Sequence, residues 1–126
     1  MKPRPLSPFM IGPYYRPQLT SVLSITHRAS GVFLSLAGVP LLLWWLVALS
    51  SGPEAWQAMR DCFSGLAGLL LAVVGLFSLS FHFYNGIRHL VWDTGRGLDI
   101  KTAYRSAWLV LGSSVATTGI LLGALP

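Results

Sequence analysis

Charged side chains are scarce in this chain of 126 residues, because only 9 are Lys or Arg and only 4 are Asp or Glu. Together they make up 10% of the sequence, whereas a water-soluble domain carries roughly a quarter charged residues to solvate its surface. The mean hydropathy is correspondingly high, at +0.61. This composition excludes a soluble enzyme, a nucleic-acid-binding domain and a disordered chain.

Cysteines and acidic residues are also too few for several kinds of chemistry. The single cysteine, Cys62, excludes an intramolecular disulfide and a cysteine-based zinc site. All the acids lie in predicted loops or at helix ends, so the chain lacks both a membrane-buried carboxylate for proton pumping and a carboxylate pair for hydrolysis. We therefore do not expect the isolated chain to be catalytic. The first residues also lack the pattern of a removable signal peptide, so we expect insertion through the mature helices.

The uncharged residues are gathered in three long runs. There are 25 between Arg28 and Glu54, 26 between Asp61 and Arg88, and 21 after Arg105. Each run exceeds the roughly 20 residues that an α-helix needs to cross a ~30 Å hydrocarbon core. We therefore predict an all-α integral membrane protein with three transmembrane helices.

The chain is predicted to form one membrane-anchor domain over residues 1–126, with an N-terminal arm at 1–18 and helices at about 20–49, 63–92 and 103–125. Prolines keep the arm out of regular helix. Pro40 is predicted to kink the first helix. The segment Ser50-Ser51-Gly52-Pro53 predicts a short loop, and Asp93-Thr94-Gly95-Arg96-Gly97 predicts a second one.

Positive charges are distributed unevenly between the two ends of the predicted helices. Eight of the 9 cations flank the start of the first helix or the second loop, and only Arg60 lies at the opposite end. By the positive-inside rule, the N-terminus and the second loop are predicted to be cytoplasmic, and the first loop and the C-terminus to lie outside. The net charge of +5 then reflects orientation in the membrane.

An ionisable residue at membrane depth is costly and is therefore a candidate functional residue. His82 and His89 are seven residues apart, which places them on one face of the second helix together with Gly86. Small residues beside a histidine leave a flat groove with a nitrogen in it, as a planar macrocycle with a central metal requires. His82 lies roughly 9 Å along the helix from Arg88, so a haem at His82 could point its carboxylates at His89 and Arg88.

The first helix carries a second polar-to-small stripe at helical spacing, formed by Ser24, His27, Arg28, Gly31 and Ser35. The two stripes could face each other. From these patterns alone, the alternatives are that His82 is a histidine hydrogen-bonded to a neighbouring helix, that His27 and His89 are solvated, and that Arg28 and Arg88 are simple topology anchors. Gly31-x-x-x-Ser35 and Gly119-x-x-x-Gly123 are typical of close helix packing.

Several ordered motifs closely resemble the cytochrome b556 subunits of succinate dehydrogenase. These motifs are Arg4-Pro5-Leu6-Ser7-Pro8, Arg16-Pro17-Gln18-Leu19-Thr20-Ser21, Ser24-Ile25-Thr26-His27-Arg28-Ala29-Ser30-Gly31 and His82-x-x-x-Gly86-x-Arg88-His89-Leu90-x-x-Asp93. The resemblance covers essentially the whole chain. One departure is Phe9, where members of the family often have a histidine.

The resemblance implies a role for each matching residue. His82 matches the axial ligand of haem b, with the other axial histidine supplied by a second small membrane-anchor subunit. His27, Arg28 and His89 match positions on the haem propionate side, and Ser24 and Arg28 match the serine and arginine of the quinone site.

The resemblance also implies partners and a location. The chain would anchor a flavoprotein subunit and an iron-sulfur subunit to the lipid bilayer of the bacterial cytoplasmic membrane, and would form part of the site that reduces quinone with electrons from succinate. A haem-free structural anchor and the anchor of a fumarate reductase are the alternatives.

Overall fold

Three helices in the structure are long and apolar enough to cross a membrane. The computed structural model describes residues 17–124, so most of the N-terminal arm, including Phe9, lies outside the described residues. The spans are Leu19–Ser51, Gly65–Asp93 and Ile100–Gly123, and the described residues contain helices and turns but no strand. The prediction of an all-α chain with three transmembrane helices is therefore confirmed.

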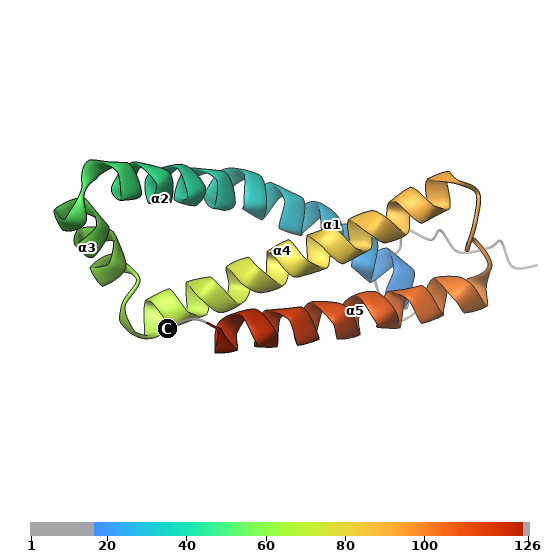
Figure 1. Ribbon diagram of the computed structural model, residues 1–126. Coiled ribbons are helices and arrows are strands. Elements are labelled where there is room, and N and C mark those ends of the chain that lie inside the picture. The colour runs from blue at the N-terminus through green and yellow to red at the C-terminus, as the bar shows by residue number, and fades with distance from the viewer. Residues whose placement is uncertain (1–16, 125–126) are drawn as a thin grey trace, which may run out of the picture.

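The first span consists of three consecutive pieces, α1 (Leu19–Phe33), a π-helical turn η1 (Leu34–Gly38) and α2 (Val39–Ser51). Pro40 explains the π-helical turn, because it has no backbone N–H to donate and its ring clashes with the carbonyl four residues earlier. The N–H of Val39 instead bonds to the carbonyl of Leu34, five residues back. Figure 1 shows the helix changing direction between α1 and α2, in agreement with the kink predicted at Pro40.

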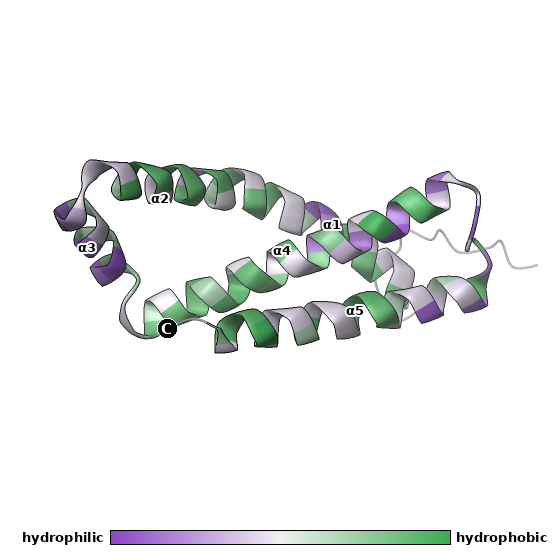
Figure 2. Ribbon diagram, in the orientation of Figure 1, coloured by the Kyte–Doolittle hydropathy of each residue, from purple (hydrophilic) through white to green (hydrophobic). Residues whose placement is uncertain are grey.

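The segment after α2 corrects the sequence prediction, which had only a short loop there. Residues Pro53–Cys62 form a further helix, α3. Gly52 ends α2 with a φ of +104°, a conformation that favours glycine, and Pro53 then occupies the first turn of α3, where no N–H is needed. Glu54 in the first turn and Arg60 in the last turn match the helix dipole. Figure 2 shows that α3 is hydrophilic beside the apolar α2.

The other two spans are α4 (Gly65–Asp93) and α5 (Ile100–Gly123). They lie antiparallel and side by side, and α1 crosses α4 while also touching α5, whereas α2 leads away to pack on α3 (Figure 1). The start of α1, the end of α4 and the start of α5 therefore share one end of the bundle. The buried apolar core lies where α1, α4 and α5 meet, and it comprises Leu23, Phe81, Ala107 and Val110.

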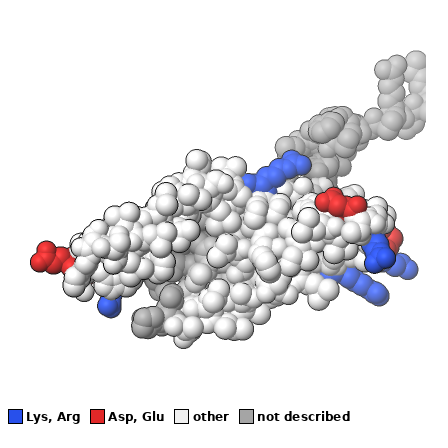
Figure 3. All heavy atoms as spheres, turned by 45° about the horizontal axis from the view of Figure 1, so that its top comes forward, with Lys and Arg blue, Asp and Glu red and all other residues white. Residues whose placement is uncertain are grey.

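Most of the large apolar side chains lie on the outside of the molecule. Leu36 on the first span, Leu66 on α4 and Ile120 on α5 are each more than 70% exposed. Figure 3 shows the charged side chains near the two ends, with a broad uncharged region between them. This distribution suits a hydrocarbon environment, in which apolar side chains face outward.

Candidate functional site

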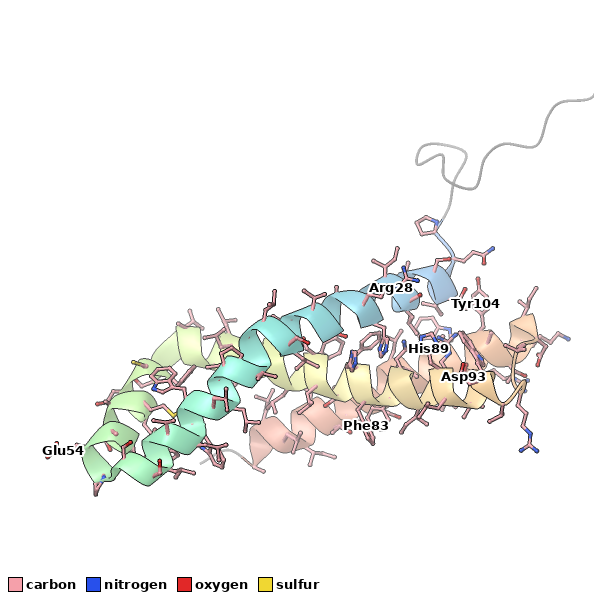
Figure 4. The ribbon with its side chains drawn as sticks, turned by 90° about the horizontal axis from the view of Figure 1, so that it is seen from above. Arg28, Glu54, Phe83, His89, Asp93 and Tyr104 are labelled. Atoms are coloured by element: carbon pink, nitrogen blue, oxygen red, sulfur yellow. The ribbon has the colours of Figure 1, made fainter. Side chains whose placement is uncertain are left out.

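All three histidines of the chain come together where α1 crosses α4. The ring of His27 on α1 stacks on that of His82 on α4, with 4.0 Å between centroids and 9° between planes. The ring of His89, also on α4, lies 5.2 Å from His27 with a tilt of 41°. The structure thus brings the two polar stripes face to face, and Figure 4 shows Arg28 and His89 at the same end of the bundle.

One edge of the His82 ring is held by α1. Its Nδ1 atom lies 3.1 Å from the hydroxyl of Ser30 and 3.2 Å from the backbone carbonyl of His27. Among the described residues, the hydrogen bonds of the His82 ring are made by Nδ1 and none by Nε2. A histidine that binds a metal through one nitrogen usually donates a hydrogen bond from the other, so the ring has the arrangement of a ligand through Nε2.

An open groove of about 560 Å³ runs beside His82 along α1 and η1. Its lining residues are His27, Arg28, Gly31, Val32, Ser35, Leu36 and His82. Gly31 and Ser35 make part of this wall flat, since neither carries a bulky side chain. The Nδ1 atom of His27 is buried and has no hydrogen-bond partner among the described residues, so its hydrogen-bonding capacity is unused in this arrangement.

The described residues contain no group of three or more His, Cys, Asp or Glu side chains arranged to hold a metal ion. The three histidines therefore do not form a metal site by themselves. A macrocycle that supplies most of the metal ligands and needs one imidazole from this chain is compatible with the arrangement.

Arg88 does not line this groove, contrary to the expectation that it would face the haem carboxylates. It is only 5% exposed and points toward α5, where it donates to the Ser106 hydroxyl at 2.9 Å and to the Ala103 carbonyl at 3.2 Å. Arg88 follows His82 by six residues, and six residues turn a helix by about 240°. The two side chains therefore leave α4 on different sides. His89, seven residues from His82, is on the side of α4 that faces His27 of α1.

Further contacts fix Arg88 within the bundle. It donates to the side-chain oxygen of Asn85 at 3.3 Å, and its guanidinium carbon lies 3.9 Å from the centre of the Trp92 ring. Trp92 in turn contacts one of the histidines, since the rings of Trp92 and His89 meet edge to face with 5.3 Å between their centres. Arg88 is therefore a structural link between α4 and α5.

The remaining sequence candidates lie in different surroundings. Ser24 is partly buried on α1 and is not among the residues that line the groove. Gly86 lies beside His27, but a Cβ there would be at an ordinary contact distance of 3.8 Å from the ring. At Gly31 a Cβ would lie 2.9 Å from Cε1 of His82, so Gly31 is the glycine that the close approach requires.

Ser30 is the functional candidate that sequence reasoning missed. Its side chain is buried and contacts His82, a residue 52 positions away in the sequence. The signal was its position three residues after His27, which places it beside the polar stripe of α1. The long-range contact itself could not be inferred from a helical pattern.

Comparisons with a family model and with individual proteins point to the same family. Residues 1–121 match the family described as "Succinate dehydrogenase/Fumarate reductase transmembrane subunit". The succinate dehydrogenase cytochrome b556 subunit of Rickettsia prowazekii is 36% identical, over 94% of this chain and 90% of the relative. That of Paracoccus denitrificans is 34% identical over 94% and 89%. The mitochondrial succinate dehydrogenase cytochrome B subunit of Schizosaccharomyces pombe is 36% identical over 92% and 66%.

Proposed function

Because the chain belongs to the succinate dehydrogenase/fumarate reductase transmembrane subunit family, we propose that it is the haem b-binding membrane anchor of a succinate dehydrogenase. In this proposal it holds the flavoprotein and iron-sulfur subunits at the bacterial cytoplasmic membrane. It shares one haem b with a second small anchor subunit and forms part of the quinone-reduction site. The chain contributes to the enzyme as a subunit and is not catalytic when isolated.

The observation that supports the haem assignment is the hydrogen bonding of His82. Its Nδ1 atom faces the carbonyl of His27 at 3.2 Å and the hydroxyl of Ser30 at 3.1 Å, so both ring contacts within the described residues are made by Nδ1 and leave Nε2 free to bind a ligand. His82 is therefore assigned as the residue of this chain that would hold the haem iron. A haem bound here would supply a one-electron redox centre for electron transfer.

Three further side chains are assigned to the propionate side of the haem. Arg28 and His27 line the groove, and the Nδ1 atom of His27 has no hydrogen-bond partner within residues 17–124. His89 lies next to His27, at 5.2 Å between ring centres. These groups can donate hydrogen bonds to carboxylates, and a guanidinium can do so with two parallel N–H groups.

Ser24 and Arg28 are assigned to the quinone. Reduction of a quinone to a quinol takes up two electrons and two protons, so the site needs hydrogen-bond donors at the carbonyl oxygens and a route for protons. The two residues are four apart on α1, which places a hydroxyl and a guanidinium on the same face of the helix. With this end of the bundle in the cytoplasm, protons come from cytoplasmic water.

The haem assignment is tested by optical spectroscopy of the purified complex. Dithionite-reduced material is expected to show low-spin b-type bands, and His82→Gln is expected to remove or strongly disturb them. Phe83→Leu is the matched control, since Phe83 is the next residue on α4 but is 60% exposed and absent from the groove (Figure 4). Unchanged bands in His82→Gln would favour a haem-free role for this histidine.

The quinone assignment is tested by comparing two assays of the same membranes. Ser24→Ala and Arg28→Leu are expected to depress succinate-dependent quinone reduction by tenfold or more, because losing one hydrogen bond to a charged group has about this effect. Succinate oxidation by an artificial dye is expected to be retained. Ser21→Ala, one turn earlier on α1, is the control. Equal loss of both activities would indicate failed assembly and contradict the assignment. Assays of fumarate reduction by the same complex separate a succinate dehydrogenase from a fumarate reductase.

A further inference from the structure

Three polar atoms meet around the inner edge of the His82 ring. The Ser30 hydroxyl donates to the carbonyl of His27 at 2.8 Å. The Nδ1 atom of His82 lies 3.1 Å from that hydroxyl oxygen and 3.2 Å from that carbonyl oxygen. The two contacts of His82 join α4 to α1, and the contact between Ser30 and His27 lies within α1. Ser30 is only 7% exposed at this interface.

These contacts determine which ring nitrogen of His82 carries the proton. A carbonyl oxygen can only accept, so Nδ1 must be the donor in its contact with His27. The Ser30 hydroxyl donates its single proton to the same carbonyl and can accept from Nδ1 through its oxygen. If Nδ1 were unprotonated, its lone pair would face that of the carbonyl. Only the tautomer with the proton on Nδ1 satisfies every contact.

Gly31 brings the same edge of the ring close to the backbone of α1. A Cβ at this position would lie 2.9 Å from Cε1, 3.5 Å from Nδ1 and 3.8 Å from Nε2 of His82. The ring is thus confined by the helix on one edge and by the stacked His27 ring on its face. The position of the ring therefore depends on α1 at Gly31 and His27.

We propose that Ser30 is a positioning residue that, with the backbone carbonyl of His27, holds His82 in the Nδ1–H tautomer and presents the Nε2 lone pair to the haem iron. The inference rests on the proposed haem-binding function and adds a residue to it. Hydrogen bonds of this kind raise the basicity of a metal-bound imidazole, and their loss typically weakens metal binding 10- to 100-fold. A more basic imidazole also favours the ferric over the ferrous iron, so Ser30 lowers the reduction potential of the haem.

The experiment compares Ser30→Ala, Ser30→Val and Ser30→Thr in the complete membrane-bound complex. Valine and threonine have nearly the same shape, but only threonine keeps a hydroxyl that can bond to the carbonyl three or four residues earlier. The measurements are the midpoint potential of the haem, its low-spin electron paramagnetic resonance spectrum and the rate of haem loss in detergent. Ser114→Ala is the control, because Ser114 is also buried but its hydroxyl donates to the carbonyl of Val110 in its own helix.

Ser30→Ala and Ser30→Val are expected to raise the potential, shift the resonance spectrum and lose haem about tenfold faster. Ser30→Thr is expected to resemble the wild type. If all three variants and the control match the wild type, the positioning role is wrong, while the loss of the bands in His82→Gln still supports haem binding. If threonine and valine change the haem equally, the hydroxyl has no role. If the wild-type complex holds no haem, both proposals fail.

Discussion

Gly31 allows α1 to approach the ring of His82 closely, because it has no side chain at the point of contact. Gly31→Ala would place a methyl group 2.9 Å from Cε1 of that ring, so either the ring or the helix has to move. Such overpacking usually costs about 1–3 kcal/mol. We expect the variant complex to have a lower Tm and a disturbed haem spectrum, both measured on detergent-purified material.

Gly75→Ala is the matched control for this substitution. Gly75 is a glycine within α4, and outside its own stretch of helix no atom of the described residues lies within 4 Å of the position of an added Cβ. Alanine is also the better helix former, so the Tm of this variant should stay the same or rise. A Gly31→Ala complex with wild-type Tm and spectrum would show that the close approach of α1 to His82 is unnecessary.

Arg88 is a buried cation held by neutral partners. It donates to Asn85, Ser106 and the Ala103 carbonyl, and no ion pair is present among the residues that the structure describes. Arg88→Met would remove these bonds between α4 and α5, and we expect a loss of stability on the order of 2–3 kcal/mol. Arg88→Lys should recover little of it, because an ammonium group lacks the planar fork of a guanidinium.

Thermal unfolding of the purified complex measures this effect. Arg96→Ala serves as the comparison, since Arg96 is exposed in the turn after α4 and its removal should leave Tm unchanged. Equal Tm values for Arg88→Met and Arg96→Ala would mean that the Arg88 contacts do not stabilise the bundle.

At the scale of the helices, the sequence predicted the three spans and the shared face of His82 and His89, because hydrophobic length and the 3.6-residue period are local properties. It did not predict the direction of Arg88, since α4 packs on α1 with one face and on α5 with another. The helix α3 was missed although Pro53 and Glu54 are helix-start signals, because the charged, turn-rich segment was interpreted as a loop. The contact of Ser30 with His82 depends on the rotation of two helices and is not encoded in either alone.

The start of α5 depends on Asp99. Its carboxylate accepts a hydrogen bond from the backbone N–H of Thr102 at 2.9 Å, and this bond lowers the pKa of Asp99. Because the pKa is lower in the folded protein than in the unfolded chain, the ionised carboxylate stabilises the folded state at neutral pH. This contribution is lost as the pH falls through the lowered pKa.

Asp99→Ala should therefore lower Tm most at neutral pH, and the difference from the wild type should shrink below about pH 4, near the ordinary pKa of aspartate. Thermal unfolding of both proteins between neutral and acidic pH measures this. Asp93→Ala, at the end of α4, removes a carboxylate that does not cap a helix start. A difference in Tm that is independent of pH would contradict the assignment of the cap to the ionised form.

At the scale of the whole molecule, the bundle leaves much apolar surface for other components of the membrane. Trp45 and Leu46 on α2 are 40% and 47% exposed, and α2 packs on α3 while α1 packs on α4 and α5. The groove beside His82 is likewise open on one side. If the proposed function holds, a second anchor subunit that supplies another haem ligand approaches this open side, and we expect haem to be retained by the assembled complex and not by this chain alone.

The orientation of the whole chain can be tested with its single cysteine. Cys62 is exposed at the end of α3, at the opposite end of the bundle from the turn that contains Thr94 (Figure 1). Because the cations gather at the end with that turn, the positive-inside rule places Cys62 outside. A membrane-impermeant maleimide should label Cys62 in right-side-out vesicles but not in intact inside-out vesicles. Thr94→Cys, in a Cys62→Ser background, should show the reverse pattern. The opposite result for both cysteines would place Ser24 and Arg28 on the outer side of the membrane, and protons for quinone reduction could then not come from the cytoplasm.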